Sequence, residues 1–233
     1  MKIQIKNLGV LKQAEFSLGD LTILCGGNNT GKTYATYALF GFLSLWREEF
    51  SLEIHNDKIQ RLLADGVVHI NVLEYVEHAA QILSEGCQTY TKQLYKVFAA
   101  PADRFKTTEF QVILDTADIR LIGDRYDRKM RAANAELFSL SKSEKGTELV
   151  ITLLVEKEKV KIPQDVVMRI ITDALKDIIF GHLFPNPFIA SAERTGAAIF
   201  RKELNFARNR LLKEVSQADK NVDAMELVST LFN

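Results

Sequence analysis

A glycine-rich run, GGNNTGKT at positions 26–33, constrains this chain more than any other segment. It follows a short apolar stretch at 21–25. It opens a segment at 32–46 whose side chains are apolar nearly all round, which predicts a buried helix. The run fits the pattern G-x-x-x-x-G-K-[ST] of a phosphate-binding loop. We therefore expect an α/β fold in which this loop joins a covered strand to a buried helix.

The residue types in the run suit a triphosphate. Gly26 and Gly31 allow a sharp turn and a close backbone approach, so that N–H groups can form an anion nest. Lys32 supplies a point charge for the outer phosphates, and the Thr33 hydroxyl offers an oxygen to Mg²⁺. The N-terminus of the helix adds positive potential. The alternative is a strand-to-helix turn without a ligand. The residues expected to bind nucleotide are Gly26, Gly27, Asn28, Asn29, Thr30, Gly31, Lys32, Thr33 and Tyr34.

Composition excludes several other classes of protein. The 30 Lys and Arg residues balance 30 Asp and Glu residues, so the chain lacks the long-range field of a strongly basic nucleic-acid binder. Two cysteines are too few for a disulfide framework, and the four histidines have no metal-ligand spacing. There is no secretory signal, and the most apolar run is shorter than the roughly 20 residues of a membrane helix. We expect a cytoplasmic protein with reduced thiols.

Hydrophobic periodicity predicts the other elements. Strands are expected at 2–6, 14–18 and 21–25, a helical region at 51–100, and then an antiparallel series at 110–114, 119–122, 135–140 and 149–155. A helix at 163–180, a short strand at 188–190 and a helical region from about 198 complete the chain.

Two basic clusters stand out, and each fits either contacts to nucleic-acid phosphates or a solvated face. They are Arg125, Arg128, Lys129 and Arg131 beside Tyr126, and Arg201, Lys202, Arg208, Arg210 and Lys213.

The N-terminal arrangement resembles the ABC-type, AAA-family P-loop ATPases of the SMC, RecF and overcoming-lysogenisation-defect (OLD) group. The resemblance rests on IQIKNLG at 3–9, on LTILC at 21–25 and on the loop with its two asparagines. A second segment, PFIASAERTG at 187–196, is similar to the strand-plus-PAER(T/S)G segment of those ATPases, with Ser191 at the usual proline. In that layout the segment leads into the Q-loop, which implies a catalytic role for Glu193 together with Lys32. The alternative is that Glu193 and Arg194 form a solvated pair that caps the next helix.

The resemblance implies an α/β P-loop NTPase fold of the ABC and SMC type. A mixed sheet would surround the helix at 32–46, with an antiparallel β piece and a helical insert at 51–107. Residues 1–233 would form a single ATPase-type domain, the N-terminal lobe of a longer ATPase, and 198–233 would begin the helical subdomain. We find no Walker B strand, signature motif or switch histidine. The nearest Walker B candidate, 149–155 followed by Glu156, carries one acid.

The leading functional hypothesis is ATP binding, with Mg²⁺-dependent ATP hydrolysis when another lobe supplies the missing elements. The resemblance implies an ATP-dependent homodimer or a partner lobe, a nuclease or DNA partner, no membrane, and an association with phage defence. The alternative is a nucleotide-binding regulatory module that does not hydrolyse. A small-molecule kinase is disfavoured because no lid-like arginine cluster is seen, and a GTPase because no Asn-Lys-x-Asp motif occurs.

Overall fold

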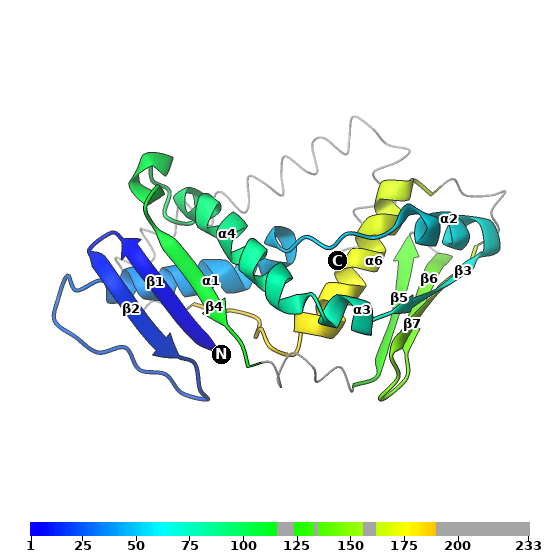
Figure 1. Cartoon of the computed structure of the whole chain (residues 1–233), viewed down its shortest axis with the longest axis horizontal. Helices are drawn as coiled ribbons and strands as arrows, with labels where there is room; N and C mark the ends of the chain where they lie inside the picture. Colours follow the sequence, from blue (N-terminus) through cyan, green and yellow to red (C-terminus); the bar gives the residue numbers. More distant parts are fainter. Residues whose placement is uncertain (116–123, 133–134, 156–161, 190–233) are drawn as a thin grey trace.

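The computed structural model describes residues 1–115, 124–132, 135–155 and 162–189. Within them lie two antiparallel sheets and five α-helices, with α1, α4 and α6 between the sheets (Figure 1). The elements in chain order are β1 (Lys2–Leu8), β2 (Leu11–Ser17), α1 (Lys32–Glu49), α2 (Asn56–Asp65), β3 (Val67–Asn71), α3 (Leu73–Val76), α4 (Ala79–Val97), the 3-10 helix η1 (Ala102–Phe105), β4 (Glu109–Ile113), β5 (Tyr126–Ala132), β6 (Ala135–Lys142), β7 (Glu148–Leu153) and α6 (Gln164–Phe180).

The first sheet has the strand order β2-β1-β4. Its central strand, β1, pairs antiparallel with both neighbours, so that Ile5 lies opposite Ala14 on one side and Phe110 on the other. Ile3 and Ile5 are fully buried, whereas Lys6 on the other face is exposed and pairs with Glu109. This period of two places the apolar face of the sheet against the helices.

Helix α1 packs its buried side against α4 and the first sheet. The Phe42 ring lies 5.6 Å from that of Tyr90 and 5.3 Å from that of Phe110, both measured between ring centroids. The Tyr90 hydroxyl is buried and donates a hydrogen bond of 2.6 Å to the Ala38 carbonyl. This bond satisfies a polar group that would otherwise be costly to bury.

The second sheet, β3-β7-β6-β5, is antiparallel throughout and shares one hydrophobic core with the first part of the chain. Helix α6 links the two parts. Its Phe180 lies edge-on to Phe50, with centroids 4.9 Å apart, and it stacks with Phe184. Phe184 in turn lies 5.1 Å from Trp46 of α1. The aromatic rings therefore connect α1 to α6.

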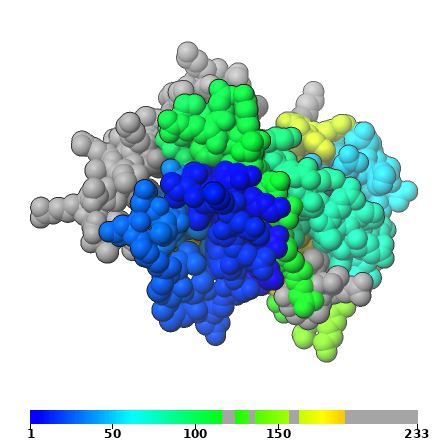
Figure 2. All heavy atoms as spheres, turned by 60° about the vertical axis from the view of Figure 1, so that its left-hand side comes forward, coloured from blue at the N-terminus to red at the C-terminus, as the bar shows by residue number. Residues whose placement is uncertain are grey.

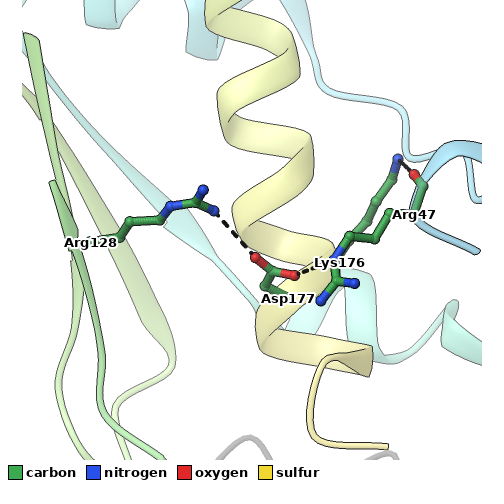
Figure 3. Close-up of polar contacts among 4 residues, drawn as sticks. All are labelled: Arg47, Arg128, Lys176 and Asp177. Carbon is green, nitrogen blue, oxygen red and sulfur yellow. Dashed lines mark hydrogen bonds and ion pairs between the residues drawn. The ribbon is translucent and has the colours of Figure 1, made fainter. Parts of the chain in front are cut away.

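A charged cluster joins the same elements at the edge of this core (Figure 3). Asp177 of α6 accepts a hydrogen bond of 2.9 Å from Arg47 Nε at the end of α1, and one of 3.4 Å from Arg128 of β5. The neighbouring Lys176 ammonium donates to the Arg47 carbonyl at 2.5 Å. Burial lowers the pKa of Lys176 and raises the pKa of Asp173, one turn earlier. These groups tie α1, α6 and β5 together.

Most expected elements are confirmed, but the sheet around α1 differs from the expected one. The strands expected near 2–6, 14–18, 110–114, 135–140 and 149–155, and the helices at 32–46 and 163–180, are present. We expected a mixed sheet around α1 with residues 21–25 as a covered strand. Among the described residues every strand pair is antiparallel, and residues 21–25 belong to no strand. Leu21 and Ile23 are 79% and 71% exposed, and no described strand pairs with this segment.

Two strands lie where the sequence did not indicate them. Val67–Asn71 forms β3 inside the segment expected to be helical, because its alternating side chains pair with β7. The sequence of strand β5, YDRKMRA, is mostly charged and lacks the alternation of apolar and polar residues that predicts a strand. Phe188 and Ile189 form no strand, and Phe188 is 89% exposed. Residues 119–122, Ala190 and residues 198–233 lie outside the described residues.

None of the helices in the described ranges is both long enough and apolar enough to span a membrane. The cytoplasmic location stays a prediction.

A methyl group added at Gly86 tests the α1–α4 packing. Its Cβ would overlap the ring of Phe50, which is 1% exposed and enclosed by other rings. Overpacking a core lowers the free energy of unfolding by ~1–3 kcal/mol, and the higher helix propensity of alanine raises it by ~1 kcal/mol. Because the added Cβ overlaps the enclosed Phe50 ring directly, the cost should lie in the upper part of this range, at ~2–3 kcal/mol, so Gly86→Ala should lower the free energy of unfolding by about 1–2 kcal/mol in urea titrations. Gly19→Ala is the matched control, because no atom lies within 4 Å of the added Cβ. A Gly86→Ala protein as stable as the parent would contradict the packing.

Replacing Asp177 by Asn tests the charged cluster. The variant keeps the shape of the side chain but loses the charge shared by Arg47 and Arg128, each of which is nearly half exposed. Two such pairs should be worth about 1 kcal/mol together, and less at high salt. Asp103→Asn is the control, since its pair with Lys106 is far more exposed and should contribute nothing measurable. Equal losses in the two variants would show that the cluster does not join the elements.

Candidate functional site

The glycine-rich loop, residues 26–33, turns directly into α1. Gly31 is the N-cap residue of α1 and has a left-handed backbone with φ of 93°. A Cβ at this position would also overlap the side chain of Leu11, at the start of β2. Position 31 therefore requires glycine for both its conformation and its contact with the β1–β2 turn.

The loop curls around the ammonium group of Lys32. Lys32 Nζ donates hydrogen bonds to the carbonyl oxygens of Gly26, at 2.8 Å, and Gly27, at 2.5 Å. The Thr30 hydroxyl donates to the Gly27 carbonyl at 2.9 Å and so closes the turn. Asn29 adopts a left-handed backbone with φ of 60°, which Asn tolerates better than most residues. The result is a single positive charge held at the mouth of a tight backbone turn.

The first turn of α1 is open to an anion. No described side chain caps it, and the turn itself contains no acidic residue. The first hydrogen bond of the helix runs from the Ala35 amide to the Gly31 carbonyl, at 3.1 Å, so the preceding amides lack helical acceptors. The Thr33 side chain in this turn is exposed. The free amides of this turn and the Lys32 ammonium therefore both contribute positive potential near the start of α1.

The donor set fits Mg²⁺ only together with phosphate oxygens. Thr33 offers one exposed hydroxyl, and no group of three or more His, Cys, Asp and Glu side chains able to hold a metal occurs among the described residues. Mg²⁺ commonly keeps several waters and binds through one or two protein ligands plus substrate phosphates. Thr33 would hold the ion, and the ion would neutralise phosphate charge.

Two pockets lie beside α4, and only one of them is lined by residues of the glycine-rich loop. The larger, about 450 Å³, runs along α4 and β4, and no residue of the glycine-rich loop lines it. The smaller, about 350 Å³, is lined by Thr33 and Tyr34, by Gly9 of the β1–β2 turn and by residues around η1. Its position beside Thr33 makes the smaller pocket the relevant one.

The structure brings together the expected residues 26–34 but describes no expected catalytic acid. Glu193 and Glu156 lie outside the described residues. No carboxylate in the described part of the chain is paired with Lys32, whose ammonium bonds are to loop carbonyls. The expected nucleotide-binding residues therefore form one continuous loop and helix start, and the acid stays a prediction.

The basic cluster on β5 is neutralised by nearby carboxylates. Lys129 and Arg131 both pair with Glu136, and these bonds lower the pKa of that carboxyl. Arg125 pairs with Asp127, and Arg128 with Asp177. This arrangement favours a solvated face over a surface for nucleic-acid phosphates. The second basic cluster, at 201–213, lies outside the described residues.

Sequence reasoning missed the residues that the fold brings to the loop from elsewhere. Gly9 and Leu11 come from the β1–β2 turn, and Phe98 and Arg104 come from more than sixty positions downstream. For Phe98 and Arg104 the only local signal is the AAP run at 99–101, which marks the end of a helix and where Ala99 has a φ of 46°. No spacing pattern connects that break with residues 26–33.

Comparison with known proteins agrees with this geometry. The family model described as AAA ATPase domain matches residues 1–176, which include the loop, both sheets and most of α6. No curated protein and no solved structure matches the chain. A match over three quarters of the chain that includes the glycine-rich loop indicates an ATP-binding ATPase. The chain belongs to the AAA ATPase domain family.

Proposed function

We propose that this chain binds ATP through residues 26–34 and hydrolyses it only when another lobe completes the site. The observation that carries the proposal is the Lys32 ammonium, held in a tight loop at the uncapped start of α1. Loop amides and Lys32 would bind the outer phosphates, and Thr33 would hold Mg²⁺. Phosphoryl transfer to water depends mainly on such positioning and charge neutralisation.

We assign the chain to the SMC, RecF and OLD group within its family. IQIKNLG at 3–9, LTILC at 21–25 and PFIASAERTG at 187–196 support this assignment. Glu193 is then the candidate that positions the attacking water. The output would be a conformational change in a nuclease or DNA partner, with phage defence as the biological setting.

The missing elements would come from a partner lobe. The exposed side chains of Leu21 and Ile23 support this, because an apolar segment directly before the loop has no described strand beside it. A strand supplied by a second copy or by another segment could pair with this stretch, and the layer packed on it would cover these side chains. Such a strand could also carry the catalytic carboxylate.

A non-hydrolysing nucleotide-binding module is the second candidate. It is favoured by the sequence, in which we find no Walker B strand. The two candidates agree on ATP binding and differ on turnover. Phosphate release measured on the binding samples separates them.

Lys32→Ala tests the proposed site. In calorimetry with Mg²⁺ and ATP, the variant should bind ATP about tenfold or more weakly, since charged hydrogen bonds to phosphate are lost. Lys92→Ala is the control, because Lys92 is exposed on α4 and lines the larger pocket. Equal affinities of the parent and Lys32→Ala would refute the proposal. Phosphate release by the parent under conditions in which it stays monomeric with ATP would refute the need for another lobe.

The reactivity of Cys25 offers a second, independent test of ATP binding at the loop, and Cys87 provides an internal reference. Cys25 is exposed beside Gly26, whereas Cys87 is 2% exposed in α4 and burial raises its pKa to about 11. A thiol reagent at pH 8 should therefore modify only Cys25 in the folded chain, and both cysteines after denaturation. Mg²⁺ and ATP should slow the modification of Cys25.

The protection should disappear in Lys32→Ala, and Cys25→Ser should leave no fast-reacting thiol. Unchanged Cys25 reactivity at saturating ATP would place the nucleotide away from the loop.

A further inference from the structure

Strand β4 lies at one edge of the first sheet, and among the described strands only β1 pairs with it. In Figure 2 the green segment that includes η1 and β4 lies between the blue N-terminal strands and the blue-green residues of α4. The larger pocket, of about 450 Å³, runs along this side of the strand. Its volume is within the ~300–1,000 Å³ of ligand sites, so β4 and α4 border a groove large enough for a ligand.

The pairing of β1 fixes the direction of the backbone groups of β4. The Leu18 amide donates to the Met1 carbonyl at 2.9 Å, so every second residue counted from Met1 bonds to β2, and the residues between them, such as Gln4, bond to β4. Gln111 lies opposite Gln4 and therefore turns its backbone groups toward β1. Phe110, its neighbour, directs its amide and carbonyl to the open edge.

The contact between Val112 and Cys87 agrees with this direction. Burial raises the pKa of the Cys87 thiol to about 11, and a hydrogen bond with the Val112 backbone opposes the rise. Val112 lies two residues after Phe110, so the backbone groups of both residues point to the same edge. Helix α4 thus covers the edge at Val112, whereas the groove borders it at Phe110.

The residues that line the groove show that it follows this edge. Successive side chains of a strand point to opposite faces of the sheet, yet residues 109, 110 and 111 all line the groove. They do so together because the edge of the strand, and not one of its faces, borders the groove. The opposite wall is one face of α4, whose lining residues recur at helical spacing: Ser84, Gln88, Thr91, Lys92 and Tyr95.

The charges in the groove favour an acidic ligand. Lys92 is exposed, and no carboxylate among the described residues pairs with it. Lys106 pairs with Asp103, but the two side chains are 72% and 79% exposed, and such a pair contributes little. Glu109, the one acidic residue among the described residues that line the groove, pairs with Lys6 at 3.0 Å. The groove therefore complements carboxylates.

Strand β4 also lacks the features that protect an edge strand. Strand β5, at the edge of the second sheet, is mostly charged and has a register shift between Met130 and Arg131. Strand β4 has an unbroken register with β1 and a single charged residue, Glu109. Charges and bulges discourage pairing with another chain, so β4 is the more open of these two edges.

We infer that an extended, acidic segment of a partner protein pairs with the open edge of β4 and fills the groove beside α4. Its backbone bonds to Phe110, and its carboxylates lie beside Lys92 and Lys106. In this mode of recognition main-chain hydrogen bonds give affinity and side chains give specificity. The inference is independent of the proposed function, because no residue of the glycine-rich loop lines the groove.

The probe is a fluorescein-labelled, capped hexapeptide of alternating Val and Glu, whose binding to the full chain is followed by fluorescence anisotropy. The parent should bind it, and Lys92→Glu should weaken binding about tenfold or more, because repulsion replaces a charge-assisted hydrogen bond. Lys145→Glu is the matched control, since it changes the net charge equally but lies exposed in the turn after β6 and lines neither pocket. It should bind the peptide as the parent does.

A second peptide separates strand pairing from attraction between charges. Methylation of every backbone amide of the hexapeptide keeps its carboxylates but removes its main-chain donors. The methylated peptide should therefore bind about tenfold or more weakly than the original. A peptide with Lys in place of Glu should also bind more weakly than the original, because the groove is positively charged.

Unfolding curves check that each variant is folded. Failure of the folded parent to bind the Val and Glu peptide, equal affinities of Lys92→Glu and Lys145→Glu, or unchanged binding of the methylated peptide would each overturn the inference. So would Lys92-dependent binding of a labelled single-stranded oligonucleotide by a parent that does not bind the peptide, since the groove would then recognise nucleic acid.

Discussion

The packing of Phe42 against Tyr90, Phe110 and Phe184 holds α1 between the first sheet, α4 and α6. Both ends of the helix depend on that anchorage. At one end the glycine-rich loop is braced by Leu11 against Gly31, and at the other Arg47 reaches Asp177. This buried aromatic side chain thus helps to set where the glycine-rich loop lies relative to the first sheet. This is a usual way in which a rigid core positions a functional loop.

The sequence predicted the parts of the site that are local. A loop of fixed spacing followed by an apolar helix depends on neighbouring residues alone, and the structure has Lys32, Thr33 and Gly31 in that arrangement. The contacts from Gly9, Leu11 and Phe98 depend on how distant segments pack, so no local pattern could reveal them. The expected strand at 21–25 failed for a related reason, because an apolar run becomes a strand only when another strand pairs with it.

Charge is distributed so that the loop remains accessible to an anion. Outside the loop, the cations of β5 are paired with carboxylates, and Lys176 bonds to the Arg47 carbonyl. Among the described residues, Lys32 bonds only to neutral carbonyl groups, which are weaker partners than a carboxylate. A phosphate group would therefore replace neutral acceptors rather than compete with a charged one. A net charge of zero for the whole chain is compatible with a locally positive site.

The strand order of the first sheet has a consequence for how the chain folds. Strands β1 and β2 are joined by a tight turn and can pair early, whereas Lys6 of β1 and Glu109 of β4 are 103 positions apart. Closing a loop of that length is entropically unfavourable, and such non-local pairing slows folding. Because α1 and α4 lie within that loop and pack on the sheet, their docking helps to bring β4 to β1. The sheet beside the glycine-rich loop is then completed only after about half of the chain has been synthesised, so the loop gains its final support late in folding.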